Sequence, residues 1–494
     1  MLRYVCLFLG LLAALSAAAE ERAPRPSVLK LTLESAIQAA LSKSFAIQVQ
    51  QFDPKIAKQD VTRQLGHFDP ELYLNVDRNE TSQRELFAND LRLETRTVNR
   101  LDTFSAGLRG ATSIGLTYDV GVASQNTLGI FNLFTDNYQS QGAVTLTQPL
   151  LRGFGTAANL AQVRIARNNV KISEWALRKG IIDIITQANF VYNELHYAHE
   201  ALLVAERSRE LARQLFNDNS SRYKIGTMAQ LDVTEARAQV AAREEAVILA
   251  ERVVRDNENL LKQLVTNDME RMLSVAVEIA PPPVVPFRAD VPAGIRDALE
   301  LRPDYRQNRL DIENRNITIA FTRNSALPRF DLTGSLALLG FDNDFAGSFN
   351  RVPRRDETVW SVGAIVSIPI PNREGRGAVI AAKLEAAKSL VALQQLEQQI
   401  VVDVDNASGQ IVTSRERIES TSEATRLAKE SLDAGEQKLK AGTGTTFEVL
   451  DLQQKLAQAE ASEIRARADY NKAVSEYQRQ TGTALRVHNV VLNQ

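Results

Sequence analysis

The second half of this sequence repeats the first half in the same order, and this duplication limits the folds available to the chain. Matching aliphatic and proline positions lie 258 residues apart (295 − 37), as in Ile37 and Ile295, Ala40 and Ala298, and Pro70 and Pro328. Farther along, Gly226 and Gly442 lie 216 residues apart (442 − 226). An internal repeat of this kind predicts two structurally equivalent units in one chain.

A shorter offset later in the chain indicates an insertion in the first copy. The segment TQPLLRGFG at 147–155 matches SIPIPNREG at 367–375 at an offset of 220 (367 − 147), which is 38 residues less (258 − 220). We place the extra residues in the charged stretch 78–100. The predicted organisation is a first repeat at 20–278, a proline-rich linker at 279–291 that cannot continue a helix, a second repeat at 292–484 and a tail at 485–494.

Both copies contain long segments with helical patterning. Residues 156–217 and 376–438 contain no proline and are rich in Ala, Gln, Glu and Arg. Roughly 60 helical residues would extend about 90 Å, which is too far for an ordinary globular domain. Each segment is followed by a second predicted helix, at 228–265 and 446–480, in which apolar residues recur every seven positions. This recurrence predicts coiled-coil packing.

Between the helical segments the period changes to two, which predicts amphipathic strands. We place four strands, at 103–123, 138–150, 328–340 and 358–370. So few strands cannot close a barrel. An open sheet in lipid would leave unpaired backbone groups at a cost of several kcal/mol each, so strands in a membrane would require oligomerisation. The alternative is that the hairpins cap a soluble periplasmic coiled-coil scaffold.

Composition argues against one class of partner and predicts export. The 494 residues carry a formal net charge of −2, without the basic excess typical of nucleic-acid-binding surfaces. Residues 1–19 combine Arg3, an apolar run and small residues, which predicts a cleaved secretory signal peptide. The single cysteine, Cys6, lies inside it, so we expect neither a disulfide nor a lipid anchor. No later apolar run has the roughly 18 residues of a transmembrane helix, which leaves a soluble exported protein or a membrane β-barrel.

A glycine followed by two carboxylates occurs once in each copy. Gly226-Thr227 precedes Asp232 and Glu235, and Gly442-Thr443 precedes Glu448 and Asp451. The glycines are predicted to supply the left-handed backbone of helix C-caps. The acids have an ordinary structural explanation, because Thr445 and Glu448 form a capping-box pattern and the helix dipole favours acids in a first turn.

Motifs for chemistry are few. His196 and His199 lie three apart on a predicted helix, but no third ligand with suitable spacing accompanies them, so we predict no metal site. The segment RGFG at 152–155 lacks the spacing of a phosphate-binding loop. No nucleophile, base and orienting residue form a recognisable set, and we therefore predict neither an enzyme nor a bound cofactor.

Aromatic residues mark two regions of the predicted hairpins. Tyr118, Tyr138, Phe330 and Trp360 lie near strand ends, where either a membrane-interface girdle or ordinary β-propensity would place them. Phe131, Phe134, Phe345 and Phe349 lie in the two hairpin loops. For these four, contact with lipopolysaccharide, closure of a pore and simple packing are all open.

In this order the motifs resemble those of the TolC-like outer membrane efflux protein family. The similarity runs from LTLESAIQAAL at 31 to QTGTAL at 480, and includes Arg302-Pro303-Asp304, Pro328, SIPIPNREGRG at 367 and LKAGTGTTFEVLDLQQ at 439. The resemblance implies a mixed α and β fold. A duplicated helix, hairpin, long helix and helix unit would form part of a trimeric outer-membrane β-barrel, with four strands from each subunit, continued by a periplasmic α-helical barrel.

The resemblance further implies a passive exit duct of a tripartite efflux or type I secretion system in the outer membrane of a Gram-negative type of cell. Its partners would be two further copies of the chain, outer-membrane lipid, a periplasmic adaptor (membrane fusion) protein and an inner-membrane transporter, with no nucleic acid. The sequence does not identify the cargo.

The resemblance also assigns roles to the two glycine segments. It places Gly226, Thr227, Gly442 and Thr443 at helical hairpin tips that dock the adaptor, and Asp232, Glu235, Glu448 and Asp451 at the pore entrance or gate. The chain departs from the family at two places. Gly444 stands where a gate arginine is found, and Leu439 stands where a gate tyrosine can occur.

Overall fold

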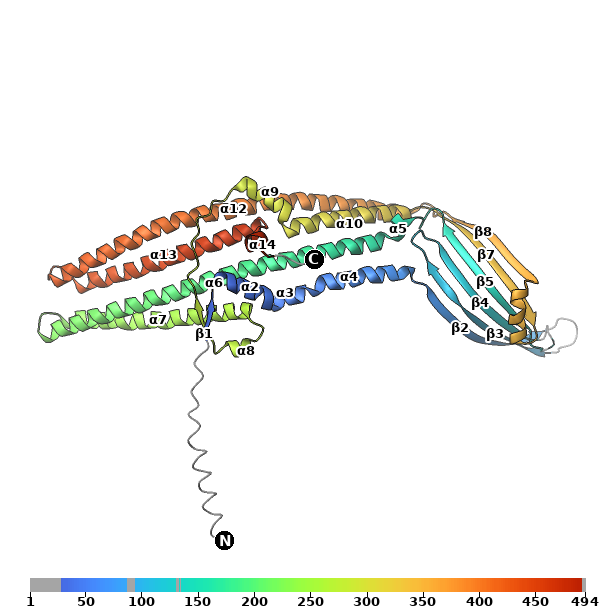
Figure 1. Ribbon diagram of the computed structural model, residues 1–494, viewed down its shortest axis with the longest axis horizontal. Helices are drawn as coiled ribbons and strands as arrows, with labels where there is room; N and C mark the ends of the chain where they lie inside the picture. The colour runs from blue at the N-terminus through green and yellow to red at the C-terminus, as the bar shows by residue number, and fades with distance from the viewer. Residues whose placement is uncertain (1–27, 87–93, 130–132, 134, 491–494) are drawn as a thin grey trace, which may run out of the picture. The chain divides into compact units, whose positions relative to one another are not determined.

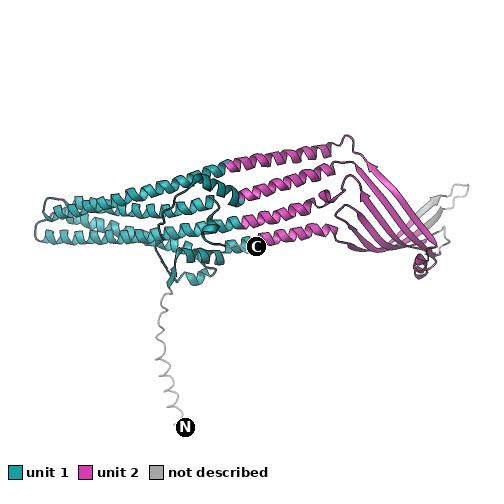
Figure 2. Cartoon of the chain, turned by 45° about the horizontal axis from the view of Figure 1, so that its top comes forward, with its two compact units in different colours: residues 1–50, 178–303, 398–494 teal, residues 51–177, 304–397 magenta. Residues whose placement is uncertain are grey.

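The computed structural model describes residues 28–86, 94–129, 133 and 135–490. The predicted signal peptide at 1–19, Phe131, Phe134 and the end of the predicted tail (491–494) lie outside the described residues. The chain divides into two compact units (Figure 2). Unit 1 comprises residues 1–50, 178–303 and 398–494, and unit 2 comprises residues 51–177 and 304–397. Each unit draws on both predicted repeats, so the repeats are not the compact units.

Unit 1 contains two helical hairpins (Figure 1). The first joins α6 (Ala161–Lys224) to α7 (Gln230–Val265), and the second joins α12 (Arg373–Lys440) to α13 (Thr446–Gln480). The helices α6 and α12, of 64 and 68 residues, also supply residues to unit 2. Long proline-free runs of good helix formers favour such lengths. Val247, Val254 and Leu261 of α7 are buried, which matches the predicted seven-residue seam.

A small parallel sheet and buried tyrosines hold the ends of the first repeat. β1 (Val28–Leu31) pairs with β6 (Ala276–Ile279). Tyr192 of α6 is fully buried, and its hydroxyl lies 3.1 and 2.6 Å from carbonyl oxygens at the end of each strand. The hydroxyls of Tyr470 and Tyr477 in α13 donate to carbonyl groups of the proline-rich linker, at 3.0 and 2.9 Å. Buried tyrosines thus satisfy backbone groups that strands and helices leave unpaired.

The remaining helices are short, apart from α10. They are α2 (Leu33–Lys43), α3 (Phe45–Gln50), α4 (Phe52–Leu65), η1 (Gly66–Phe68), α5 (Thr156–Asn159), α8 (Met269–Met272), α9 (Val291–Leu301), α10 (Pro303–Ser325), α11 (Phe345–Arg351), η3 (Val352–Arg354) and α14 (Ala484–Val487). Within the part of the chain that the structure describes, no helix is both long and apolar enough to cross a membrane.

Unit 2 contains a six-stranded antiparallel sheet. Its strands, in spatial order, are β2 (Glu71–Leu86), β3 (Glu94–Ala111), β4 (Thr117–Leu128), β5 (Tyr138–Pro149), β7 (Arg329–Asp342) and β8 (Glu357–Ser367). Four helices connect to it along the chain. α4 leads into β2, α6 follows β5, α10 leads into β7, and α12 follows β8.

The sheet corrects the strand prediction for the first copy. The predicted single strand at 103–123 is wrong, because a turn between Thr112 and Leu116, with Gly115 at a φ of 94°, separates β3 from β4. Most of the charged stretch 78–100 belongs to β2 and β3, whose charges pair across the strands, as Arg78 Nε does with Asp102 Oδ1 at 2.6 Å. In the repeat Leu74 of β2 matches Leu332 of β7, and Thr147 of β5 matches Ser367 of β8, so the added strands are β3 and β4. They form a further hairpin, which places the insertion later than the predicted 78–100, and the chain contributes six strands to this sheet instead of four.

Candidate functional site

The tips of the two long hairpins have the same backbone geometry. The amide of Gly226 donates to the carbonyl three residues earlier, and that of Thr227 to the carbonyl five residues earlier, both at 2.9 Å. The same two hydrogen bonds recur at Gly442 and Thr443, at 3.2 and 3.0 Å, and both glycines have a φ of 77°. These are Schellman caps, so the predicted left-handed C-caps are confirmed. The two threonine hydroxyls add a bond to the same carbonyls, at 3.0 and 3.3 Å.

Replacing Gly226 or Gly442 by Ala is expected to loosen the tip alone. An added Cβ would meet no atom within 4 Å at either position. Only the left-handed backbone then opposes the side chain, by about 1 kcal/mol, and hydrogen exchange of the tip amides should accelerate about fivefold. Gly409, in the interior of α12, also has no atom within 4 Å, so Gly409→Ala is the matched control and should leave tip exchange unchanged. Equal exchange in all three variants would contradict the cap assignment.

A buried cluster joins the two hairpins close to their tips. Asn219 of α6 and Thr446 of α13 are almost fully buried, and Asn219 Nδ2 donates to Thr446 Oγ1 at 3.2 Å. The apolar members come from α6, α12 and α13, namely Leu215, Leu432, Leu439, Val449, Leu450 and Leu456. The cluster therefore ties the two hairpins to each other next to their tips.

The two departures from the family pattern have structural explanations. Leu439 is only 9% exposed and packs in this cluster, so its side chain is not free to act as a gate. A Cβ on Gly444 would lie 3.0 Å from the backbone nitrogen of Leu439, so a larger residue there requires the turn to shift. At the position of the first copy that matches Leu439, Tyr223 (439 − 216) is 44% exposed. The sequence pattern did not single out Tyr223, although the repeat offset points to it.

The four predicted gate carboxylates lie near the starts of α7 and α13, with Asp232 and Glu448 in the first turn and Glu235 and Asp451 in the next. Asp232 and Glu235 are half-buried, whereas Glu448 and Asp451 are exposed. Asp451 Oδ2 lies 2.7 Å from Lys455 Nζ one turn later, an ion pair that the sequence analysis did not include. Within the described residues, no hydrogen bond or ion pair joins the acids of one tip to those of the other.

The two helix starts differ in their N-caps. The Thr445 hydroxyl accepts a hydrogen bond from the Glu448 amide at 3.2 Å, which is the threonine half of the predicted capping box. The N-cap of α7 is Ala229, which has no side-chain cap. The otherwise matching tips therefore differ in how firmly the returning helix begins.

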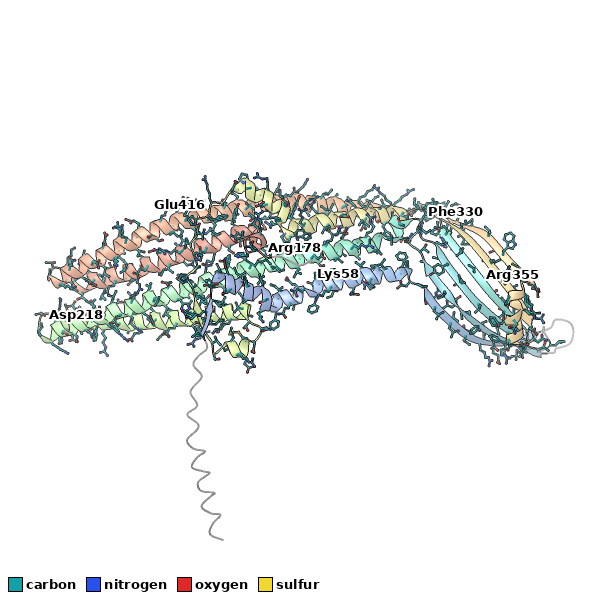
Figure 3. All side chains as sticks on the ribbon, viewed as in Figure 1. Lys58, Arg178, Asp218, Phe330, Arg355 and Glu416 are labelled. Carbon is teal, nitrogen blue, oxygen red and sulfur yellow. The ribbon has the colours of Figure 1, made fainter. Side chains whose placement is uncertain are left out.

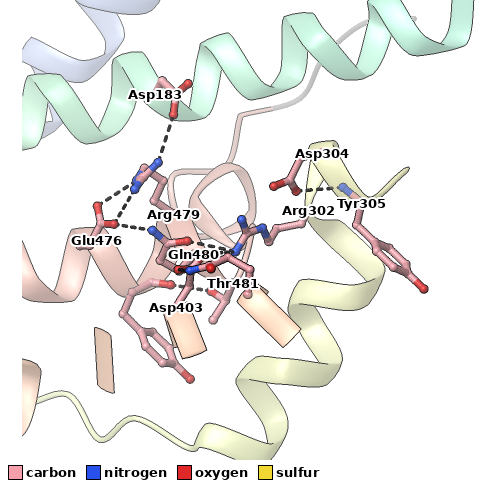
Figure 4. Close-up of polar contacts among 11 residues, drawn as sticks. Asp183, Arg302, Asp304, Tyr305, Asp403, Glu476, Arg479, Gln480 and Thr481 are labelled. Atoms are coloured by element: carbon pink, nitrogen blue, oxygen red, sulfur yellow. Dashed lines mark hydrogen bonds and ion pairs between the residues drawn. The ribbon is translucent and has the colours of Figure 1, made fainter. Parts of the chain in front are cut away.

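Polar networks fix α6, α12 and α13 of unit 1 to one another. Arg302 follows α9, and its side chain is 12% exposed. Its guanidinium lies 3.1 Å from Asp403 Oδ2 and 3.1 Å from Gln480 Oε1 (Figure 4). Nearby, Arg479 binds Glu476 at 2.6 Å and approaches Asp183 of α6 at 3.8 Å. The hydrogen bonds that Arg479 donates to Glu476 raise the pKa of Arg479 above its usual value.

The histidine pair lies within α6. Burial lowers the pKa of His196, while the charges of Glu200 and His199 act in opposite directions. His199 Nε2 is buried, and none of the residues that the structure describes forms a hydrogen bond with it. Among the described residues, no group of three or more His, Cys, Asp or Glu side chains is arranged to hold a metal ion.

The sheet of unit 2 has one apolar and one polar face. In every strand pair, directly opposed residues have numbers of equal parity, such as Val144 with Leu336, so even-numbered side chains share one face. That face carries Leu72, Leu74, Val76, Leu108, Val120, Val122, Val144, Leu146, Leu332, Leu336, Val362 and Val366, whose exposed fractions run from 38% to 78%. The opposite face is mainly polar, with pairs such as Tyr73 with Asp119 and Ser335 with Ser361.

Aromatic side chains lie on the apolar face at both ends of the sheet. The parity rule places Tyr118, Phe330, Tyr138 and Trp360 there, and Trp360 is 71% exposed. Tyr118, next to the turn between β3 and β4, and Phe330 lie at the end of the sheet where the helices join, whereas Tyr138 and Trp360 lie toward the opposite end. Figure 3 labels Phe330 at the first of these ends and the loop residue Arg355 at the other. This distribution is the one expected of a girdle at two interfaces.

The helix α11 packs on the same apolar face, at the loop end. Phe345 meets the rings of Phe104 and Tyr138 edge to face, with centroids 6.0 and 6.1 Å away, and Ser348 Oγ lies 2.6 Å from Ser140 Oγ. Of the open explanations for the loop phenylalanines, packing therefore holds for Phe345. Its ring is directed away from the polar face.

The profile of the family described as "Outer membrane efflux protein" matches residues 36–267 and 294–483. The chain belongs to this family. The predicted family is thereby confirmed, and the alternative of a soluble periplasmic coiled-coil scaffold is not favoured.

Individual relatives are distant. Nodulation protein T of Rhizobium leguminosarum bv. trifolii is 24% identical over 294 residues, covering 59% of this chain and 60% of that protein. Outer membrane protein TolC of Salmonella enteritidis is 26% identical over 310 residues, covering 58% of each chain. The alignments thus span about three fifths of the length of these two relatives.

The fold is shared with solved outer membrane channels. The Campylobacter jejuni CmeC outer membrane channel superposes with a TM-score of 0.70 at 15% identity, covering 92% of this chain and 86% of that one. The likeness confirms the fold class: mixed α and β, with the duplicated arrangement of strands and long helices found in TolC-like proteins.

Proposed function

We propose that the protein is a passive exit duct in the outer membrane, serving a tripartite efflux or type I secretion system. The observation that carries the proposal is the two-faced sheet. Twelve exposed aliphatic side chains on one face would be costly in water but suit lipid, and the polar opposite face suits a water-filled passage. Family membership supports the same reading.

Further copies of the chain would be needed to close the sheet in a membrane. The sheet is open, and its edge strands β2 and β8 have no further strand partner within the described residues. Backbone groups left unpaired in lipid cost several kcal/mol each, which favours closure against other copies. We propose a homotrimer that works with a periplasmic adaptor protein at the hairpin tips around Gly226, Thr227, Gly442 and Thr443, and with an inner-membrane transporter.

No enzymatic role is proposed, because the sites described serve to cap helices, pack hairpins and divide lipid from water. The hypothesis is tested by recording ion conductance of the purified trimer in a planar lipid bilayer. A stable ion current through a water-filled passage is expected. Well-folded protein that neither inserts nor conducts would contradict the proposal and favour a soluble periplasmic scaffold.

The gate carboxylates can be tested in the same recordings. We propose that Asp232, Glu235, Glu448 and Asp451 line the periplasmic mouth, where rings of negative charge would favour cations. Replacing Glu448 and Asp451 together by Ala is expected to lower the ratio of cation to anion permeability severalfold. Lys455→Ala, which releases Asp451 from its ion pair, should raise that ratio. Unchanged cation selectivity in both variants would contradict the assignment of these carboxylates to the gate.

A further inference from the structure

The additional hairpin of the first repeat lies inside the sheet. Strands β3 and β4 stand between β2 and β5, with 12 residue pairs between β3 and β4 and 10 between β4 and β5. Every other strand is directly connected to a helix of unit 2, whereas β3 and β4 are connected only to strands. The inserted residues thus widen the sheet without adding a helix.

The helices of unit 2 lie side by side in one layer (Figures 1 and 2). Asn168 of α6 donates to Asn314 of α10 at 3.0 Å, and Tyr305 of α10 donates to Glu397 of α12 at 3.1 Å. Their order, α4, α6, α10 and α12, follows the order of the strands to which they connect. In one copy, therefore, a row of four helices continues a row of six strands, and each row would form one arc of a closed wall.

The additional hairpin makes the row of strands about as wide as the row of helices. At a spacing of about 4.8 Å and a tilt of about 40°, each strand takes about 6.3 Å of circumference, so six strands span about 38 Å and four strands about 25 Å. Four helices packed at 8–10 Å span about 32 to 40 Å. At an ordinary strand tilt, six strands are as wide along the circumference as four helices. Four strands would reach that width only at a much steeper tilt.

The two edges of the sheet suit one another. All 11 residues of β8 are exposed, and β2 offers 16 residues. Because neighbouring strands alternate in direction and the sheet has an even number of them, β8 of one copy would meet β2 of the next in antiparallel orientation. Leu74 and Val76 at one edge and Val362 at the other lie on the apolar face, so pairing would keep that face continuous.

We propose that three copies close a wall of eighteen strands (3 × 6) and that the β3–β4 hairpin makes the membrane passage as wide as the helical section. The inference rests on the proposed function, because it requires three copies in a membrane. A passage of this width would not select cargo by size at the membrane. Bulky cargo that passes the helical section, such as a polypeptide, would then leave without a second constriction.

The direct test is to count strands in the purified full-length trimer by electron cryo-microscopy in lipid nanodiscs. Eighteen strands in one wall are expected, with β3 and β4 between β2 and β5. A trimer with twelve wall strands, and with the hairpin outside the wall, would overturn the inference and leave the proposed function intact. A sample that is not trimeric or does not enter nanodiscs would overturn both.

Engineered disulfides give a second test in the intact chain, because the only cysteine, Cys6, lies in the predicted signal peptide. Asn75→Cys is combined with Ser361→Cys or, in a separate variant, with Gly363→Cys. These polar-face positions on β2 and β8 should cross-link neighbouring copies in at least one register. The control, Ala123→Cys with Ser361→Cys, should not cross-link, because β5 and β7 separate β4 from β8. Cross-linking in the control alone would make β4 the edge and overturn the inference.

Discussion

Replacing Val144 by Arg is expected to remove most of the protein from the outer membrane. Val144 lies in β5, flanked on the apolar face by Val120 and Leu336. A charge on a lipid-facing strand near the middle of the bilayer costs about 2 to 4 kcal/mol in each copy. The amount of trimer in isolated outer membranes should fall at least tenfold, measured by immunoblotting of unheated samples.

The neighbouring residue provides a matched control. Thr145 lies on the opposite face, flanked by Asp119 and Ser335. Thr145→Arg adds the same side chain one position along the strand, where water and the carboxylate of Asp119 can accommodate it. This variant should reach the membrane at nearly normal levels. If both variants were lost equally, or both tolerated, the assignment of the two faces would be wrong.

Replacing Arg302 by Ala is expected to destabilise the helical part by about 2 to 3 kcal/mol, since hydrogen bonds to charged groups contribute about 1.5 to 3 kcal/mol and a partly buried carboxylate loses its partner. Arg302 contacts Asp403 and Gln480 together, so its loss affects α9, α12 and α13 at once. The midpoint of chemical unfolding, followed by circular dichroism of the helices, should shift accordingly.

Two further variants test whether the effect of Arg302 comes from its buried contact with Asp403. Arg426 forms ion pairs with Glu423 and Glu430 within α12, but it is exposed, so Arg426→Ala should change the unfolding midpoint little. In the second, Asp403→Asn added to Arg302→Ala should cost less than the sum of the single changes, because both remove the same interaction. Strict additivity would mean that Arg302 acts through other contacts.

The long helices and their turns could be predicted from the sequence because their signals are local. Proline-free helix formers, a heptad seam and a glycine at each tip specify α6, α7, α12 and α13 without information from the rest of the chain. The role of Arg302 could not be predicted in this way. Its partners Asp403 and Gln480 lie 101 and 178 residues later in the sequence, and only folding brings them together.

The number of strands could not be predicted because of a property of antiparallel pairing. Gly110 pairs with Tyr118 across the turn between β3 and β4, so even-numbered residues stay on one face on both sides of that turn. A hairpin of this register and a single long strand therefore have the same alternation of apolar and polar residues. Strand β2 was missed for another reason, since its charges resemble a loop until their partners on β3 are known.

The unequal N-caps of the two hairpins bear on how a ring of these chains would open. The helix that starts after Thr445 has a side-chain cap, which typically contributes about 1 kcal/mol, and the helix that starts after Ala229 has none. In a trimer the tips would alternate between stiffer and softer around the mouth. The six tips would then differ in how easily they bend, with threefold instead of sixfold symmetry. Thermal fraying would begin at the three tips whose returning helix starts after Ala229.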